Sequence, residues 1–174
     1  MQDEDEWLDL VDENDVVVSK KLRSEVHAEK LHNYRAINLF IRNSKGELWI
    51  PRRTADKQLY PLGLDFSCAG HVESGHTYEQ TLKKEAMEEL NIDIDAVDVH
   101  VLGKTTPADD LSCFAMNYEI RSDDVPSYNP NDFVEYFWLT PEAVIERIEK
   151  GDSAKSGLPK LIRRYYLSVS KNSA

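Results

Sequence analysis

The stretch of residues 70–92 constrains this chain most, because a glycine-containing turn there leads into about four turns of amphipathic helix. A helix advances about 100° per residue, so Glu85 and Glu89 project almost in line and Glu88 lies beside them. The apolar stripe of this helix runs beside Glu89, which places that carboxylate at the edge of the buried face. Crowded, partly desolvated carboxylates repel one another unless a cation lies among them. The pattern therefore predicts a divalent metal site, most naturally for Mg²⁺ or Mn²⁺.

The length of 174 residues predicts one domain with a full-sized hydrophobic core, over residues 1–174. Residues 1–6 form an acidic N-terminal tail without the basic and apolar regions of a signal peptide, and we expect residues 170–174 to be disordered. No apolar run approaches the length of a membrane span. We therefore expect no membrane partner. Cys68 and Cys113 are the only cysteines, so a cytoplasmic protein with free thiols is expected, and a disulfide between them is the alternative.

The charge balance limits the partners of this chain. A net charge of −11 argues against binding to nucleic-acid polymers, which requires a basic surface. An anionic small molecule remains compatible where local basic residues and a metal ion supply positive charge. The expected partner is such a molecule, and both a monomer and a homodimer fit the sequence.

The order of predicted elements indicates an α+β domain with a layered α/β/α arrangement and a mixed β-sheet. Alternating and apolar patterns predict a hairpin at residues 7–20 and strands at residues 34–42, 47–52, 65–71, 97–102, 111–121 and 133–139. Helices are expected at residues 77–91, 141–150 and 158–169, and residues 21–33 form a connector or short helix. Thr77 and Gln80 form a capping-box pattern at the first of these helices, and Asn91 is suited to end it.

The stretch of residues 70–92 resembles the Nudix box, G-x5-E-x7-R-E-U-x-E-E-x-G-U, in which U is apolar. The matching residues are Gly70, Glu85, Ala86, Glu88, Glu89 and Ile92. His76 replaces the first glutamate of the pattern, Lys84 the arginine and Asn91 the second glycine. The three glutamates most closely tied to metal in this family are therefore all present.

The three departures from the pattern have separate interpretations. His76 reads as an exposed turn residue. Lys84 keeps the positive charge of the arginine but loses its bidentate geometry, and we expect it to orient the glutamates. Asn91 tolerates the left-handed backbone conformation that a glycine would otherwise supply.

The resemblance extends beyond the box to about residues 7–169. The segments HNYRAINLFIRNSKGELWIPRR, K..YP, GHVESG and EYFWLTPE are similar to the Nudix branch that includes isopentenyl-diphosphate isomerase and its hydrolase relatives. In that branch, an arginine at the end of the second strand and a lysine four residues later contact the diphosphate. The matching residues are Arg53 and Lys57, whose alternative is a solvated basic loop. Arg52 alternates to the opposite face of the strand and is the weaker candidate.

The residue before the box glycine separates isomerase from hydrolase. The resemblance implies a catalytic cysteine there in isomerases, but this chain has Ala69. Cys68 lies one residue earlier, which reverses its direction in a strand and favours a core position. His71 follows the box glycine and either contacts substrate or makes a structural hydrogen bond. The aromatic residues Tyr60, Phe114 and Tyr118 either stack on a base or pack in the core.

Two acids near the end of the chain are further candidates. Asp132 corresponds to an acidic residue of the isomerases, and Glu135 follows it closely. Either of them is suited to supply an extra metal ligand or a general base, and the alternative is a solvated loop acid.

Together these features predict a metal-dependent hydrolase of nucleoside diphosphate-linked compounds, including nucleoside di- and triphosphates, that cleaves a pyrophosphate bond. Glu85, Glu88 and Glu89 are expected to hold Mg²⁺ with the carbonyl of Gly70, and Mn²⁺ is a second candidate. The alternatives are an isoprenoid-diphosphate isomerase and a non-catalytic nucleotide-binding module on the same fold.

Overall fold

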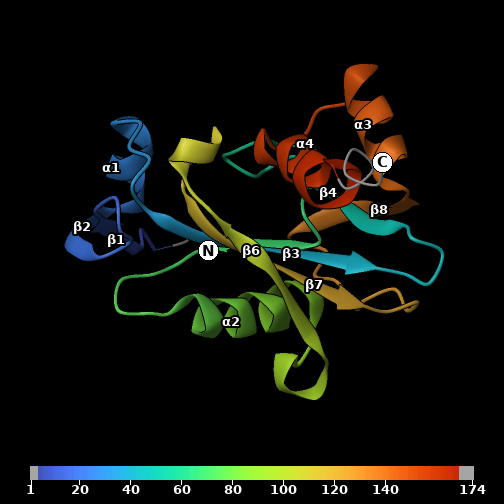
Figure 1. The fold of residues 1–174 in the computed structure, drawn as a ribbon, viewed down its shortest axis with the longest axis horizontal. Coiled ribbons are helices and arrows are strands. Elements are labelled where there is room, and N and C mark those ends of the chain that lie inside the picture. Colours follow the sequence, from blue (N-terminus) through green and yellow to red (C-terminus); the bar gives the residue numbers. More distant parts are fainter. Residues whose placement is uncertain (1–3, 169–174) are drawn as a thin grey trace.

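The computed structural model describes residues 4–168 (Figure 1). The first half of the predicted acidic tail, residues 1–3, and the predicted disordered C-terminus, residues 170–174, lie outside the described residues. Among residues 4–168, no helix is both long and apolar enough to cross a membrane.

A mixed sheet of six strands forms the centre of the fold. Five strands follow one another in the spatial order β6 (Val99–Thr105), β7 (Phe114–Arg121), β3 (Arg35–Arg42), β4 (Leu48–Arg53) and β8 (Phe133–Leu139). The short strand β5 (Cys68–His71) pairs antiparallel with the first half of β3. The pairing of β3 with β7 is parallel, and the other pairings are antiparallel. A separate two-stranded sheet joins β1 (Trp7–Val11) and β2 (Val17–Leu22), as the predicted hairpin requires.

Helices cover both faces of the central sheet (Figure 1). On one face, alternate residues of β3 such as Ile37 and Leu39 pack with Leu82 and Leu90 of α2 (Tyr78–Leu90). On the other face, side chains including Phe40 pack against α3 (Pro141–Glu149) and α4 (Gly157–Ile162). The period-two alternation of β3 thus builds two cores, and the predicted layered α/β/α arrangement is confirmed.

Local sequence signals determine both ends of α2. The side chain of Thr77 accepts a hydrogen bond from the backbone N–H of Gln80, and the side chain of Gln80 accepts one from the N–H of Thr77. Asn91 ends the helix with φ of 53°, in the left-handed region. The capping box and the asparagine stop are confirmed as predicted.

The remaining helices are short. α1 (Arg23–Ala28) occupies the predicted connector between the N-terminal hairpin and the central sheet. Single 3-10 turns lie at Ile94–Ala96 and Pro107–Asp109. The C-terminal helix forms as predicted, with α4 followed directly by a π-helical turn at Arg163–Leu167. In this wider turn, the hydroxyls of Tyr165 and Tyr166 contact polar side chains of β7.

Candidate functional site

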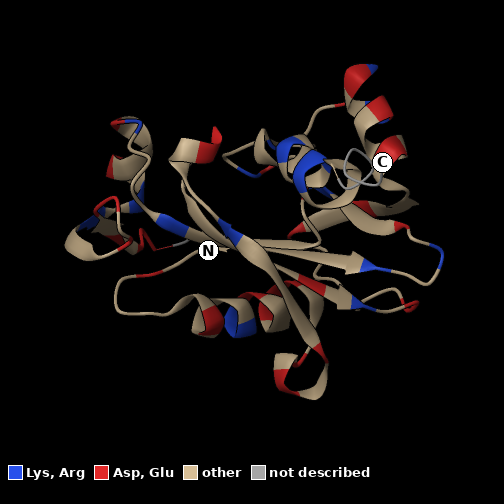
Figure 2. Ribbon diagram, in the orientation of Figure 1, with Lys and Arg blue, Asp and Glu red and all other residues tan. Residues whose placement is uncertain are grey.

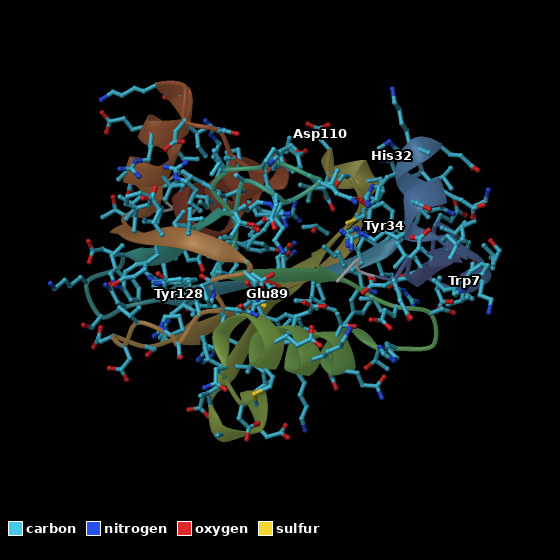
Figure 3. All side chains as sticks on the ribbon, turned by 180° about the vertical axis from the view of Figure 1, so that it is seen from behind. Trp7, His32, Tyr34, Glu89, Asp110 and Tyr128 are labelled. Carbon is cyan, nitrogen blue, oxygen red and sulfur yellow. The ribbon has the colours of Figure 1, made fainter. Side chains whose placement is uncertain are left out.

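A groove of about 1930 Å³ is the larger of two pockets found among the described residues. It is lined by α1, by the loop after β4, by β5, by one face of α2 and by the segment before α4. Figure 3 shows Glu89 between α2 and the sheet, with Tyr34 farther along the same side of the molecule. All three glutamates of the box line this groove, together with Gly70, His71, Arg53, Lys57 and Asp132.

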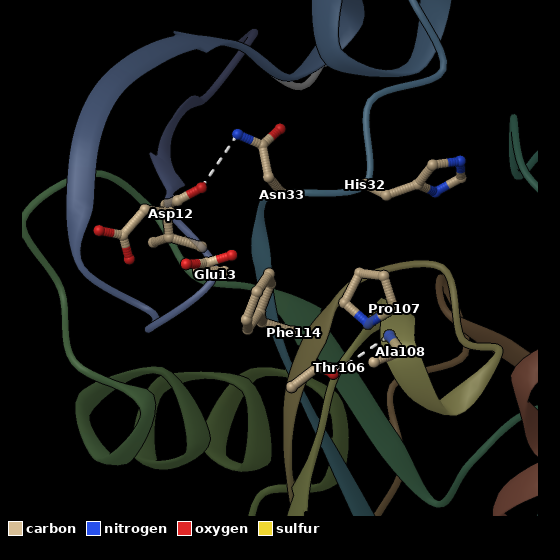
Figure 4. A pocket seen from close by; sticks show the side chains of 9 residues that line it. Asp12, Glu13, His32, Asn33, Thr106, Pro107, Ala108 and Phe114 are labelled. Carbon is tan, nitrogen blue, oxygen red and sulfur yellow. Dashed lines mark hydrogen bonds between the residues drawn. The ribbon is translucent and has the colours of Figure 1, made fainter.

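A second pocket of about 380 Å³ lies between the N-terminal hairpin and the 3-10 turn after β6 (Figure 4). Its side chains include Asp12, His32, Asn33 and Phe114. None of the box residues lines it, so the larger groove is the candidate site.

Gly70 and Glu85 approach each other closely in the groove. A Cβ atom at position 70 would lie 2.5 Å from Cδ of Glu85, so any side chain on this strand residue would displace the carboxylate. The glycine of the box is therefore required for space, and it brings the edge of β5 against α2.

Glu85 and Glu89 are partly buried side by side on α2, whereas Glu88 is exposed to the groove. Burial, followed by the charge of Glu88, raises the pKa of Glu85 to about 7. Burial, followed by the charge of Glu85, raises the pKa of Glu89 well above its ordinary value. Both carboxylates thus lack the positive charge that their ionised forms require.

This donor set fits a divalent cation. Among residues 4–168, no three acidic, histidine or cysteine side chains converge into a complete metal cage. Mg²⁺ usually keeps several waters and takes only one or two carboxylates together with substrate phosphates. Glu85 and Glu89, crowded against a glycine that leaves space, match a metal shared with the substrate better than a closed structural site.

Basic residues also line the groove, and buried or partly buried acids hold them. Arg53 donates from Nη1 to Oδ2 of Asp65 at 2.7 Å and from Nε to the carbonyl of Leu59. Lys155 pairs with the other oxygen of Asp65 at 3.1 Å. Because this one carboxylate serves two cations, the three side chains together carry one net positive charge. Lys57 is held separately, with its Nζ 2.7 Å from Oδ1 of Asp132.

The second acidic candidate lies elsewhere. Glu135 is on β8, where it accepts a hydrogen bond of 2.6 Å from Nε of Arg52. Arg52 also pairs with Asp152, and neither Arg52 nor Glu135 is among the described residues that line the groove. Strand alternation separates Arg52 from Arg53 as predicted, and it carries Glu135 away from the site.

Lys84 has a different direct partner from the expected one. Its Nζ donates to Oε1 of Glu73, in the turn that precedes α2, and no hydrogen bond to a box glutamate is present among the described residues. Its effect on Glu85 is that of a nearby positive charge, which lowers the raised pKa of that carboxyl group. His76 is exposed, in agreement with the prediction of a turn residue.

Sequence reasoning missed the contribution of α1 to the groove. His27 of α1 places its Nε2 3.1 Å from Nε2 of His71, and Tyr34 stacks on His71 with ring centroids 5.4 Å apart. Burial lowers the pKa of both histidines. Residues 21–33 carry no motif, and only the fold brings them to the box glycine.

Sequence reasoning also missed Lys155. This lysine lies in the predicted linker before α4, about 100 positions from Arg53 in the chain. Its backbone N–H donates to the carbonyl of Leu64, which fixes the linker beside the loop after β4. A single lysine in a Gly- and Ser-containing linker gives no signal that could have predicted this position.

Cys68 is fully buried on the α2 side of β5, with its Sγ 3.8 Å from Oε1 of Glu89. Burial, followed by the charge of Glu89, raises the pKa of this thiol. The prediction of a core position is confirmed. Of the three aromatic candidates, Tyr60 lines the groove, Phe114 lines the pocket of Figure 4 and Tyr118 is in the core.

The cations of the groove belong to a chain that is acidic overall. Figure 2 shows acidic residues spread over α2, α3 and several loops, as the net charge of −11 requires. Against that background, the cations at positions 53, 57 and 155 form a basic wall inside the groove. Metal-seeking carboxylates that face held cations are suited to bind a phosphate chain.

Comparison with known proteins gives the same picture. The family model described as NUDIX domain matches residues 32–161. An uncharacterized Nudix hydrolase of Nostoc sp. is 51% identical over 162 residues, which cover 92% of this chain and 96% of the relative. A Nudix hydrolase of Deinococcus radiodurans is 48% identical over 163 residues, covering 93% and 95% of the two chains.

A solved structure of similar sequence also has the same fold. The crystal structure of DR0079 from Deinococcus radiodurans superposes with a TM-score of 0.87 at 47% identity, and the match covers 92% of this chain and 99% of that one. The family resemblance of residues 70–92 is therefore confirmed over most of the chain. The protein belongs to the Nudix family and is a Nudix hydrolase.

Proposed function

We propose that this hydrolase cleaves the pyrophosphate bond of nucleoside diphosphate-linked compounds, including nucleoside di- and triphosphates, with Mg²⁺ or Mn²⁺. One observation carries the proposal: the partly buried pair Glu85 and Glu89 lies against Gly70 in the same groove as the cations Arg53 and Lys57. A diphosphate in this groove would bind the cations directly and the carboxylates through a metal ion.

The residues divide the work by charge. Glu85, Glu88 and Glu89, with the carbonyl of Gly70, would hold the metal ion. When bound, that ion supplies Lewis-acid charge to phosphoryl oxygens and lowers the pKa of water. Arg53 and Lys57 bind the phosphate oxygens and offset the negative charge that builds on the leaving group. The anchors Asp65 and Asp132 hold these two cations in place before substrate arrives.

A carboxylate of the groove takes the proton from the attacking water. The candidates are a box glutamate and Asp132. Oδ1 of Asp132 already accepts a hydrogen bond from Nζ of Lys57. His71 lines the same groove from the opposite face of β5 to Gly70, and it contributes to substrate binding in this proposal.

Isoprenoid-diphosphate isomerisation is the first alternative, because the sequence outside the box is similar to that branch. Ala69 offers no acid at the position before the box glycine, and the thiol of Cys68 is buried on the α2 face. Both observations favour hydrolysis over isomerisation.

A non-catalytic module is the second alternative, motivated by the altered box positions. The structure compensates two of them locally. Lys84 finds a carboxylate partner in Glu73, and Asn91 adopts the left-handed conformation of the missing glycine. These compensations favour a working site.

A substrate panel tests the proposal. Nucleoside di- and triphosphates, sugar nucleotides, dinucleotide cofactors and isopentenyl diphosphate are incubated with the protein and Mg²⁺, beside a Glu89→Gln variant. We expect phosphate-bond cleavage that needs the metal and is lost in the variant. Isomerised product without cleavage would establish the first alternative, and binding without turnover the second.

A further inference from the structure

The groove continues around the edge of β5 onto the sheet face opposite α2. Four small or medium side chains form a floor there: Ala36 and Asn38 of β3, Ala69 of β5 and Ala115 of β7. The strand register places Asn38 opposite Ala69, and Ala36 opposite Ala115, so all four side chains point to the same face. We call this space the sheet-face compartment.

The sheet-face compartment adjoins the metal side of the site. Ala69 precedes the box glycine directly, so the floor begins one residue from the approach of Gly70 to Glu85. Apolar and aromatic residues of the groove lie around it, among them Tyr34, Phe66, Leu111 and Leu161, and Lys155 adds one charged side chain. The compartment can therefore accommodate a flat ring that is attached to a diphosphate at the edge of β5.

A hydrogen-bond network fixes which end of the Asn38 amide faces this compartment. Nδ2 of Asn117 lies 3.2 Å from the carbonyl of Gly103, which can only accept, and it also contacts Thr105 and Tyr165. The oxygen of the Asn117 amide must therefore point the other way, toward β3. There it accepts from Nδ2 of Asn38 at 2.9 Å, which leaves Oδ1 of Asn38 as the free end.

That oxygen is an unused acceptor beside the alanines of the floor. Asn38 is only 9% exposed, and its Oδ1 has no hydrogen-bond partner within residues 4–168. It is not sealed in the interior either, because Nε1 of Trp49 is the sole fully buried unpaired side-chain polar atom among these residues. An unpaired acceptor at the floor of the sheet-face compartment favours ligands that carry a hydrogen-bond donor.

We propose that the sheet-face compartment takes the base of the nucleotide, and that Oδ1 of Asn38 selects bases that carry an exocyclic amino group. This inference rests on the proposed function. An amino group donates to Oδ1, whereas a keto oxygen at the same position faces it with like partial charge. The network behind Asn38 prevents the amide from turning over to present its nitrogen instead, so the preference is built into the sheet.

Matched nucleotide pairs test the inference in the wild-type protein. Cytidine diphosphate is compared with uridine diphosphate, and adenosine diphosphate with inosine diphosphate. In each pair, the first base carries an exocyclic amino group where the second carries a keto oxygen. We expect kcat/KM to favour the amino member of at least one pair by about tenfold. Equal kcat/KM within both pairs, or a preference for the keto members, would overturn the inference while leaving the hydrolase proposal intact.

Two substitutions at one position assign the preference to Asn38. Asn38→Leu removes the acceptor and should reduce the preference to about twofold or less, whereas Asn38→Asp keeps an acceptor oxygen and should retain it. Asn33→Leu, in the separate pocket of Figure 4, is the matched control and should behave as the wild type.

The outcomes of these experiments remain distinguishable. A preference that persists in a folded Asn38→Leu variant would show that another group reads the base. If a variant fails to fold by thermal unfolding, the wild-type pairs still decide. Failure to cleave any nucleotide would overturn the proposed function, and this inference with it.

Discussion

Glu85 is largely buried, yet its proposed function requires the charged carboxylate. The loss of stability that this burial causes should be measurable. Its pKa rises from 4.5 to about 7 on folding, so the folded chain binds the proton more tightly between these values. Metal-free protein should therefore lose stability as the pH rises from 4.5 to 7, and the loss should level off above pH 7. The carboxylate that supports activity is thus expected to weaken the empty fold at neutral pH.

Replacing this carboxylate tests the pH dependence. In the presence of a chelator, Glu85→Gln should unfold at about 3–6 °C above the wild type at pH 8, and the difference should shrink toward pH 4.5. Thermal unfolding across pH measures it. Glu146→Gln, at an exposed helical pair with Lys150, is the control and should stay within about 1–2 °C. An equal or lower unfolding temperature for Glu85→Gln at pH 8 would contradict the burial argument.

Cys68 provides a second test at this scale. Because its thiol is fully buried in the core beneath α2, Cys68→Ala should lower the free energy of unfolding by about 1–2 kcal/mol. Hydrolysis should keep its kcat/KM within about threefold of the wild type, since the thiol is no proton donor in the proposed reaction. Denaturant unfolding and steady-state kinetics measure both effects. Abolished hydrolysis by a folded Cys68→Ala protein would contradict this and show that the thiol takes part in the reaction.

At the scale of elements, α2 depends on its local caps. Asn91 holds the left-handed conformation at the end of the helix, where a residue with a Cβ and no local hydrogen bond is strained. Asn91→Ala should lower the free energy of unfolding by about 1 kcal/mol, whereas Asn91→Gly should be neutral or slightly stabilising. Denaturant unfolding of this matched pair is the measurement. Equal stability of the two variants would show that the cap conformation carries no strain.

The same contrast explains what the sequence could predict. α2, its caps and the hairpin at the N-terminus follow from signals within a few residues of one another, and these predictions are confirmed. The C-terminal helix is confirmed too, but its π-helical part was not predicted, because Tyr165 and Tyr166 there contact partners on β7 that are distant in the chain. His27, Lys155 and the Asn38–Asn117 pair escaped prediction for this reason also. Their positions depend on which strands and linkers meet in space, and no local pattern records that.

At the scale of the whole molecule, the groove is assembled from segments that span most of the chain. Lys155 illustrates this, since it reaches Asp65 only because the linker before α4 lies against the loop after β4. Lys155→Met should raise KM for a nucleoside diphosphate about five- to tenfold with a smaller effect on kcat, because it removes charge that holds substrate. Steady-state kinetics measure both constants. Lys160→Met, on α4 outside the groove, is the control, and an equal effect of both variants would show that the position in the groove is irrelevant.

The central claim is that the glutamates of α2 hold a divalent metal for a diphosphate substrate, and direct metal binding tests it most plainly. Mn²⁺ is titrated into the protein with a hydrolysis-resistant nucleoside diphosphate, and free Mn²⁺ is followed by electron paramagnetic resonance. The wild type and Glu146→Gln should show the same saturable site, and Glu89→Gln should bind Mn²⁺ at least about tenfold more weakly. Undiminished Mn²⁺ binding by a folded Glu89→Gln protein would contradict the account.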